Sequence, residues 1–342
     1  MNNVHEPKYR RMLVVGNGFD LAHNLPTRYQ DMLNALKSLS SKHDCENNWL
    51  DSQKIISYIS NPFIKYFMSR MDLDGWTGFE SEIRTIVNYF KKPFKASERP
   101  TLDIDLKIET CFRTETDLWK SLNIRSLWKE LKKDLDILIE YIDQYLSIYL
   151  PTVFPKTLSD CAHPHFIYKR NYHFLLSFNY TNTYYQLSQT VDDIGRDVPL
   201  ASQFIHGEHS INGQSQNIVL GIEDDDPSNL DTVYFKKYFQ RIQKRTGREF
   251  YNWIDPSYNP GDPIIVDVFG HSLDTTDKDV LLALFEGTLF TNIYYFDQSD
   301  YERKIINLIR LYGSPEEFTN RYYGNKIRLR KISTEDERYM TL

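Results

Sequence analysis

The chain has 342 residues, of which 41% are hydrophobic and 26% charged, and its formal net charge is -6. This composition is typical of a globular protein with one large domain or two, and the acidic balance argues against a protein that coats nucleic acid. Three widely separated cysteines, Cys45, Cys111 and Cys161, indicate neither a disulfide framework nor a zinc site, and no apolar run is long enough to span a bilayer. Without a signal-peptide pattern, the expected location is the cytoplasm.

The first predicted element is a strand at residues 12–15, where four apolar residues precede Gly16, Asn17 and Gly18. Such a run is typical of a short buried strand, and the glycines turn the chain sharply. At the carboxyl end of a strand in an open α/β sheet, a turn of this kind brings backbone N–H groups close to a phosphate. The third glycine of the dinucleotide-binding fingerprint is missing, because Phe19 and Asp20 follow, so a plain strand-to-helix turn is an equally good interpretation.

Helices are predicted in the next part of the chain. After a helix at 27–40, the apolar residues keep helical spacing through most of residues 44–155. Helices are expected there at 54–71, 79–90 and 126–149, the last with a stripe of leucines on one side. We interpret residues 44–155 as a helical insertion that packs on a sheet domain.

Short apolar runs return after the helical block, and each ends in a polar residue or a glycine. They predict strands at 174–179, 204–207, 217–221, 264–271 and 292–296, with helices at 277–287 and 302–312. Strands that alternate with helices indicate a doubly wound, mostly parallel, Rossmann-like sheet. The predicted fold is therefore α/β, with a sheet domain of residues 1–43 and 156–342 and the helical insertion at 44–155.

Residues able to carry chemistry follow several of the predicted strands. Because the carboxyl ends of parallel strands share one edge, the glycine turn, Asn179, His206 and His271 are expected to converge. Such a set suits a nucleotide sugar, with the turn binding phosphate, the amide positioning a water or a ribose hydroxyl, and a histidine acting as base. A structural interpretation stands beside it, namely an Asx turn at Asn179 and buried histidines bonded to backbone.

Three other patterns bear on binding to nucleic acid or to a metal. The basic run at 236–248 is interpreted as a solvated helix face rather than a nucleic-acid site. His163, His165 and His173 have no carboxylate at ligand spacing, so no metal site is predicted. A nuclease-type toxin would need an acidic metal constellation, and the nearest candidate, residues 223–226, is better explained as a solvated acidic loop.

Several motifs occur in a fixed order over most of the chain. They are Leu13-Val-Val-Gly-Asn-Gly-Phe-Asp-Leu-Ala-His-Asn-Leu-Pro-Thr-Arg-Tyr29, Trp76 with Phe79-Glu80, Ser177-Phe-Asn-Tyr-Thr-Asn182, Ile205-His-Gly207, Leu220-Gly-Ile222 and Phe269-Gly-His-Ser-Leu-Asp274. Together they resemble the bacterial AbiH family of phage abortive-infection proteins. The resemblance implies a role in antiviral defence, with a homo-oligomer or a phage-derived trigger as expected partners.

The order of a Gly-x-Gly turn, a strand ending in Asn and a strand ending in His-Gly is more distantly similar to the sirtuin-like NAD-binding fold. That fold includes bacterial defence domains that hydrolyse NAD, so the resemblance implies NAD as ligand or substrate. It also implies that Asn179 orients the attacking water or the ribose and that His206 is the general base. The residues expected to line the pocket are Gly16, Asn17, Gly18, Phe19, Asp20, Gly207, Gly270, His271 and Ser272.

Two departures from the sirtuins limit what the resemblance implies. The four-cysteine zinc ribbon of protein-deacylating sirtuins is absent, so deacylation is not expected. Asn17 and Asp20 stand where the sirtuin turn has small residues, which puts the phosphate cradle in doubt.

The sequence thus predicts a phage-defence protein that binds NAD or a related nucleotide and hydrolyses the nicotinamide–ribose bond, as an NAD glycohydrolase that needs no metal. The alternative is a non-catalytic nucleotide-sensing module, in which the helical insertion signals to a partner. Both functions use the same pocket, so the sequence does not separate binding from turnover.

Overall fold

The computed structural model describes residues 9–41, 49–70, 75–94, 103–156, 165–189, 199–211, 216–223, 230–257 and 262–332. The chain forms two compact units. The sheet unit comprises Met1–Leu25, Phe154–Glu208 and Arg245–Leu342, and the helical unit comprises Pro26–Val153 and His209–Lys244. Residues 26–43 and 209–244 thus group with the helical unit, whereas the sequence predicts them in the sheet domain. The domain boundaries expected from the sequence stay a prediction.

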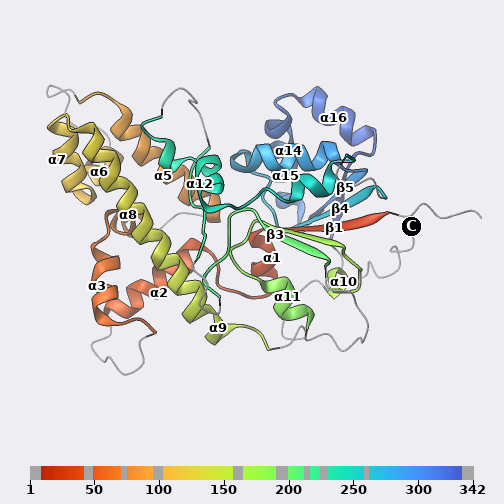
Figure 1. Ribbon diagram of the computed structural model, residues 1–342, viewed down its shortest axis with the longest axis horizontal. Helices are drawn as coiled ribbons and strands as arrows, with labels where there is room; N and C mark the ends of the chain where they lie inside the picture. Colours follow the sequence, from red (N-terminus) through yellow and green to blue (C-terminus); the bar gives the residue numbers. More distant parts are fainter. Residues whose placement is uncertain are drawn as a thin grey trace, which may run out of the picture. The chain divides into compact units, whose positions relative to one another are not determined.

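The sheet unit is built on a sheet of 6 parallel strands. They are β1 (Arg10–Val15), β2 (Phe174–Ser177), β3 (Ala201–Phe204), β4 (Ile264–Phe269), β5 (Phe290–Tyr295) and β6 (Ile327–Lys331). Their order, β3-β2-β1-β4-β5-β6, changes direction between β1 and β4, as in dinucleotide-binding sheets (Figure 1). The predicted doubly wound α/β fold is confirmed, and the carboxyl ends of β1 and β4 mark the expected place for a ligand.

Helices cover both faces of this sheet (Figure 1). One face carries α13 (Phe250–Ile254), α14 (Lys278–Gly287), α15 (Gln298–Tyr312) and α16 (Pro315–Tyr323). The other carries α1 (Asn17–Ala22), α10 (His165–Tyr168) and α11 (Thr183–Ser188). Side chains alternate along β1, so Met12 and Val14 join the first core while Leu13 and Val15 join the second. This explains why the strand is apolar at each position from Met12 to Val15.

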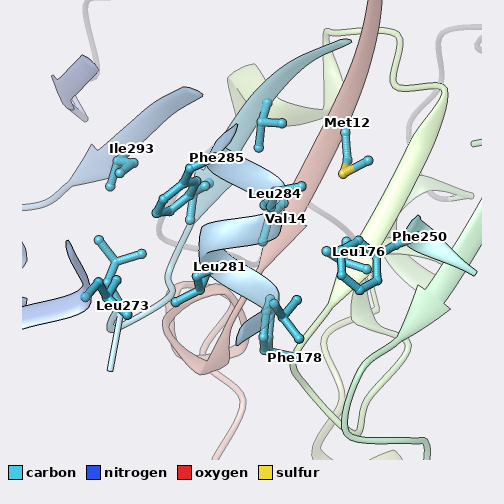
Figure 2. Packing of buried hydrophobic residues seen from close by; sticks show 14 of the residues in the cluster. Met12, Val14, Leu176, Phe178, Phe250, Leu273, Leu281, Leu284, Phe285 and Ile293 are labelled. Carbon is cyan, nitrogen blue, oxygen red and sulfur yellow. The ribbon is translucent and has the colours of Figure 1, made fainter. Parts of the chain in front are cut away.

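The core under α14 reaches the carboxyl edge of the sheet. Figure 2 shows Leu281, Leu284 and Phe285 of α14 packed with side chains of the strands, and all three are fully buried. Burying a side chain of this size contributes about 1.5–3 kcal/mol relative to leaving it exposed. Phe178 and Leu273, which follow β2 and β4, belong to the same cluster. The segments beyond these strand ends are therefore anchored in the core.

The helical unit contains most of the remaining helices. They are α2 (Tyr29–Ser41), α3 (Ser52–Ser60), α4 (Pro62–Ser69), α5 (Gly75–Lys91), α6 (Asp103–Cys111), α7 (Arg113–Lys120), α8 (Ile124–Gln144), a π-helical turn (Tyr145–Tyr149), α9 (Leu150–Val153), a 3-10 turn (Val233–Phe235) and α12 (Lys237–Lys244). Tyr141 of α8 donates to the carbonyl of Met32 and Tyr145 of the π-helical turn to that of Pro26, so these two elements hold the start of the unit. None of the described helices is long and apolar enough to cross a membrane.

One predicted helix, at 54–71, is two helices. The side chain of Asn61 accepts a hydrogen bond from the N–H of Ile64 at 3.2 Å, and Pro62 occupies the first turn of α4. A capping asparagine followed by proline starts a new helix, because proline needs no partner for an N–H group there. The apolar spacing continues across the break and therefore conceals it.

Two predicted strands are wrong. β3 ends at Phe204, so residues 205–207 lie beyond the strand. The sequence misplaces this strand because its first three residues, Ala-Ser-Gln, are partly exposed and form no apolar run. Residues 217–221 form no strand. The side chain of Gln240 accepts from the N–H of Leu220 at 3.0 Å and donates to its carbonyl at 2.8 Å, so it takes the place of a neighbouring strand. Conversely, α16 and β6 were not predicted.

The basic run at 236–248 does not form the solvated helix face that the sequence predicts. Lys236 is 1% exposed, Lys237 3% and Arg241 8%. Lys237 forms an ion pair with Glu80 at 2.9 Å inside the helical unit. These three cations are therefore buried within the unit, and the prediction is wrong for them. Arg245 and Arg248, which follow α12, are exposed as predicted.

Candidate functional site

The candidate site follows one row of the sheet. In the register of the adjacent strands β3, β2, β1 and β4, the residues Phe204, Ser177, Val15 and Phe269 lie side by side at the carboxyl edge. The residues two positions further along the chain are His206, Asn179, Asn17 and His271. The residues predicted from sequence thus leave the sheet at equivalent positions.

The turn after β1 packs directly on the turn after β4. The N–H of Gly16 donates to the carbonyl of Phe269 at 3.1 Å, and the N–H of Gly18 donates to that of Gly270 at 2.8 Å. A Cβ at Gly16 would lie 2.7 Å from the Cα of His271, and a Cβ at Gly18 would lie 2.8 Å from that of Gly270. The glycines therefore allow two segments to touch, and these N–H groups are engaged within the protein rather than with a phosphate.

The next residues of the first motif form α1 and pack it against the sheet. Asn17 begins α1, while the ring of Phe19 is fully buried in the core on that face of the sheet. Nδ1 of His23 lies 2.6 Å from the carbonyl oxygen of Phe19, and Nε2 of His23 lies 3.0 Å from the hydroxyl of Tyr168. A histidine with both nitrogens engaged in this way fixes α1 against α10.

Asp20 is a buried carboxyl group at the centre of a hydrogen-bond cluster. It accepts from the hydroxyls of Thr181 at 2.5 Å and Thr183 at 2.7 Å, and the amide of Asn179 also bonds to it. Asn179 donates in addition to the carbonyl of Gly16 at 3.0 Å. Burial raises the pKa of Asp20 to about 7, although these hydrogen bonds act in the opposite direction. A carboxyl group that titrates near neutral pH can give or take a proton.

A small pocket adjoins Asp20. Its volume is about 180 Å³, including the part open to solvent, and its polar lining consists of Asp20, Ser177, Asn179, Thr181, Asn182 and Thr183. Oδ1 of Asn182 is buried there and has no hydrogen-bond partner among the described residues. Pockets for drug-sized ligands have about 300–1,000 Å³, whereas no part of this hollow is wide enough for a water-sized sphere, so in this conformation it encloses no part of a nucleotide.

We expect the pKa of Asp20 to make stability depend on pH. The carboxyl group holds a proton up to about pH 7 in the folded protein but only up to about pH 3.8 in the unfolded chain. Its contribution to stability is therefore fully present below pH 3.8 and is lost as pH rises toward 7. Stability should fall as pH rises between the two values, by roughly 4 kcal/mol at most, since each pKa unit corresponds to about 1.4 kcal/mol. Denaturant unfolding of the wild type and of Asp20→Asn across this range measures the effect.

The exposed Asp279 of the same unit provides the matched control, Asp279→Asn, for the loss of a charge. Asp20→Asn should flatten the pH profile, and the control should keep the wild-type profile. A wild-type slope in Asp20→Asn would contradict the raised pKa.

His206 pairs with Asp277, a residue that the sequence did not single out. Nε2 of His206 lies 2.8 Å from Oδ1 of Asp277, and Nε2 of His271 lies 3.6 Å from its Oδ2. The ring of Phe178 packs on both imidazoles, with centroid distances of 5.5 Å and 4.2 Å. All three polar residues are buried. The structure therefore brings the two predicted histidines to one carboxylate.

The loop of His271 is anchored from α15. Nζ of Lys304 donates to the carbonyl of His271 at 2.9 Å, and Asn307 donates to that of Ser272 at 2.9 Å. Leu273 has a φ of 61° and donates its N–H to Nδ1 of His271 at 2.9 Å. A bulky residue with positive φ is strained. The buried side chain of Leu273 (Figure 2) holds this conformation. The side chain of Ser272 is exposed.

The predicted residues thus form two groups of polar contacts rather than one. The first group links Asp20, Asn179 and the turn at Gly16, and the second links His206 and His271 through Asp277. Gly207 follows His206 with a φ of 76°, which lets the chain turn away after β3. The sequence missed Asp277, Thr181 and Thr183, although the two threonines alternate directly after Asn179.

No described cluster of three or more His, Cys, Asp or Glu side chains is arranged to hold a metal ion. Two of the three histidines considered above as metal ligands, His163 and the side chain of His165, lie outside the described residues. Residues 224–226 of the acidic run also lie outside them. His173 accepts a hydrogen bond from the N–H of Arg11 at 3.2 Å and thus serves the start of β2.

A family model described as "Bacteriophage abortive infection AbiH" matches residues 12–296. The match runs from β1 to the end of β5 and includes both groups of the candidate site. A comparison with curated proteins gave no significant match.

Proposed function

Because the chain belongs to the bacteriophage abortive infection AbiH family, we propose that it acts in phage defence by hydrolysing the nicotinamide–ribose bond of NAD or of a related nucleotide. The observation that carries this proposal is the buried pair of His206 and Asp277 beside Asn179 at the carboxyl edge of the sheet. A histidine held by a carboxylate is a common general base, and this edge is where doubly wound sheets bind nucleotides.

In the proposed reaction, the C1′–N bond of the nicotinamide ribose breaks and a water oxygen bonds to C1′. Nicotinamide leaves as a neutral molecule with the bonding electron pair, so it needs no proton. The proton of the attacking water passes to His206. Asn179 orients the water or a ribose hydroxyl, and the carboxyl group of Asp20 stabilises the positive charge that develops on the sugar.

The size of the pocket limits how NAD can bind. The hollow beside Asp20 is too narrow to enclose a ligand in this conformation, so we assign to the substrate a place at its mouth, where it contacts Asn179, with most of the nucleotide outside. The N–H groups of Gly16 and Gly18 are engaged with backbone carbonyls, so a phosphate needs other donors. A smaller nucleotide or nucleoside is therefore a substrate to test beside NAD.

We expect the purified protein to release nicotinamide and ADP-ribose from NAD, and Asn179→Ala and His206→Ala each to reduce the rate by roughly 100-fold or more. Chromatography of the products measures the rate. Asn252→Ala changes an exposed asparagine of α13 and should keep full activity. Thermal unfolding shows whether each variant is folded, which matters because Asn179 also holds the turn at Gly16.

Release that persists in both folded variants would contradict the proposed catalytic roles. Binding of NAD in calorimetry without release, also after addition of lysate from phage-infected cells, would favour the alternative function, a nucleotide-sensing module. That function uses the same buried polar groups without turnover.

A further inference from the structure

We infer that Asp277 and His271 are positioning residues, which keep the proton of His206 on Nε2 and so make Nδ1 its basic nitrogen. The catalytic meaning of this inference rests on the proposed function. The position of the proton on His206 does not depend on the proposed function, and it can be measured without any turnover.

His271 has both ring nitrogens directed within the protein. The N–H of Leu273 donates to Nδ1 at 2.9 Å, so this nitrogen carries a lone pair. The neutral ring must then hold its proton on Nε2, which faces Oδ2 of Asp277 at 3.6 Å. Lys304 fixes the carbonyl of the same residue from α15. His271 is therefore a fixed N–H group aimed at the carboxylate.

The surroundings of Asp277 favour its ionised form. The N–H group of His271 faces Oδ2 at 3.6 Å, and a positive dipole end near a carboxylate favours its charged form. Asp277 is also the N-cap residue of α14, where the helix dipole favours negative charge. An ionised carboxylate has no proton to donate, so Nε2 of His206 must be the donor in the 2.8 Å bond between them.

The neutral ring of His206 then has its lone pair on Nδ1, and the neighbouring carboxylate stabilises the imidazolium that forms when Nδ1 takes a proton. The described rings that face this imidazole include Phe178, which is apolar, and Tyr180, whose centroid is 6.4 Å away. Two charged or titratable groups therefore act on His206 in this arrangement. Asp277 contacts its ring directly, and His271 faces the other oxygen of Asp277. The two histidines are not interchangeable, because Nδ1 of His271 already accepts the N–H of Leu273.

The experiment is long-range ¹H–¹⁵N NMR of the imidazole rings of the full chain during a pH titration, with His206→Gln to identify the signals. We expect neutral His206 to carry its proton on Nε2 in the wild type. Asp277→Asn should lower the pKa of His206 by about one unit or more, a tenfold change in proton affinity, because the negative charge is lost. His271→Gln should lower it less, and Asp279→Asn should leave it unchanged.

Neutral wild-type His206 with its proton on Nδ1 would overturn the inference, and so would an unchanged pKa in folded Asp277→Asn. The wild-type spectrum needs no variant, so it decides the matter even if Asp277→Asn does not fold.

If NAD is cleaved, Asp277→Asn should lower kcat by roughly 10²–10⁴-fold with KM little changed, and move the acidic limb of the pH profile to lower pH. Unchanged kcat and pH profile would overturn the positioning role. If the wild type does not cleave NAD, the proposed function fails, while the NMR spectra still decide where the proton of His206 lies.

Discussion

Replacing Gly270 with alanine should lower the free energy of unfolding by about 4 kcal/mol or more. The residue has a φ of +69°, and a Cβ there would lie 2.1 Å from the backbone nitrogen of Phe19 and 2.5 Å from the carbonyl carbon of Gly18. Both are backbone atoms of the turn after β1, so relief of the clash requires that the two turns separate. Denaturant unfolding followed by circular dichroism measures the loss.

Gly313 provides the matched control for this substitution. It has a similar φ of +74°, but a Cβ there would meet nothing within 4 Å. Gly313→Ala should therefore cost only the conformational penalty, about 1–2 kcal/mol. Equal losses in the two variants would contradict the explanation by contact between the turns and leave the backbone conformation as the cause.

The second large effect is expected for Arg170→Met, which should destabilise the protein by about 3–5 kcal/mol. Nη1 of Arg170 lies 2.7 Å from Oδ2 of Asp267, a residue of the central strand β4 that is 1% exposed. Tyr172 and Asn292 also donate to this carboxylate, at 3.0 Å and 2.7 Å, but they are neutral. The substitution would thus leave a buried charge without its main partner.

Arg11 is the matched control for Arg170. Its Nη1 is 3.6 Å from the same carboxylate oxygen, and its side chain is 20% exposed. Arg170 is exposed to a similar extent, 18%, so the two differ in distance. Arg11→Met should cost less than about 1 kcal/mol, because at 3.6 Å its guanidinium is beyond hydrogen-bond distance of the carboxylate. Arg170→Met combined with Asp267→Asn should recover part of the loss, because the unpaired charge is gone. Similar costs for the two arginine variants would show that the buried pair is not the reason.

The strands were predictable where both faces are buried. β1 is apolar from Met12 to Val15, and β4 is apolar except for Asp267, so the sequence marks each as a short apolar run. β3 lies at the edge of the sheet, and three of its residues, Ala-Ser-Gln, are partly exposed, so no apolar run marks where it begins. In residues 217–221 the apolar run is buried without a strand, because a side-chain amide from α12 satisfies the backbone.

The positions of the candidate site were predictable, but its contacts were not. The sequence shows a glycine turn, an asparagine and two histidines after strands, yet the strand order decides that Gly18 touches Gly270. Asp277 precedes a helix, where an aspartate is typical of a cap. Its bond to His206 joins parts of the chain that are far apart, and local pattern carries no sign of it. The same reason hides the partner of Lys237 in the basic run.

The anchoring of the His271 loop by α15 has a consequence for synthesis. Lys304 and Asn307, which anchor the loop, are translated after all the other residues of the candidate site. The loop is therefore not fully anchored until both have left the ribosome. Asp20, Asn179 and His206 emerge long before them. A nascent chain released before α15 therefore lacks a complete site, so any toxic activity of the site begins only with polypeptides that extend through this helix.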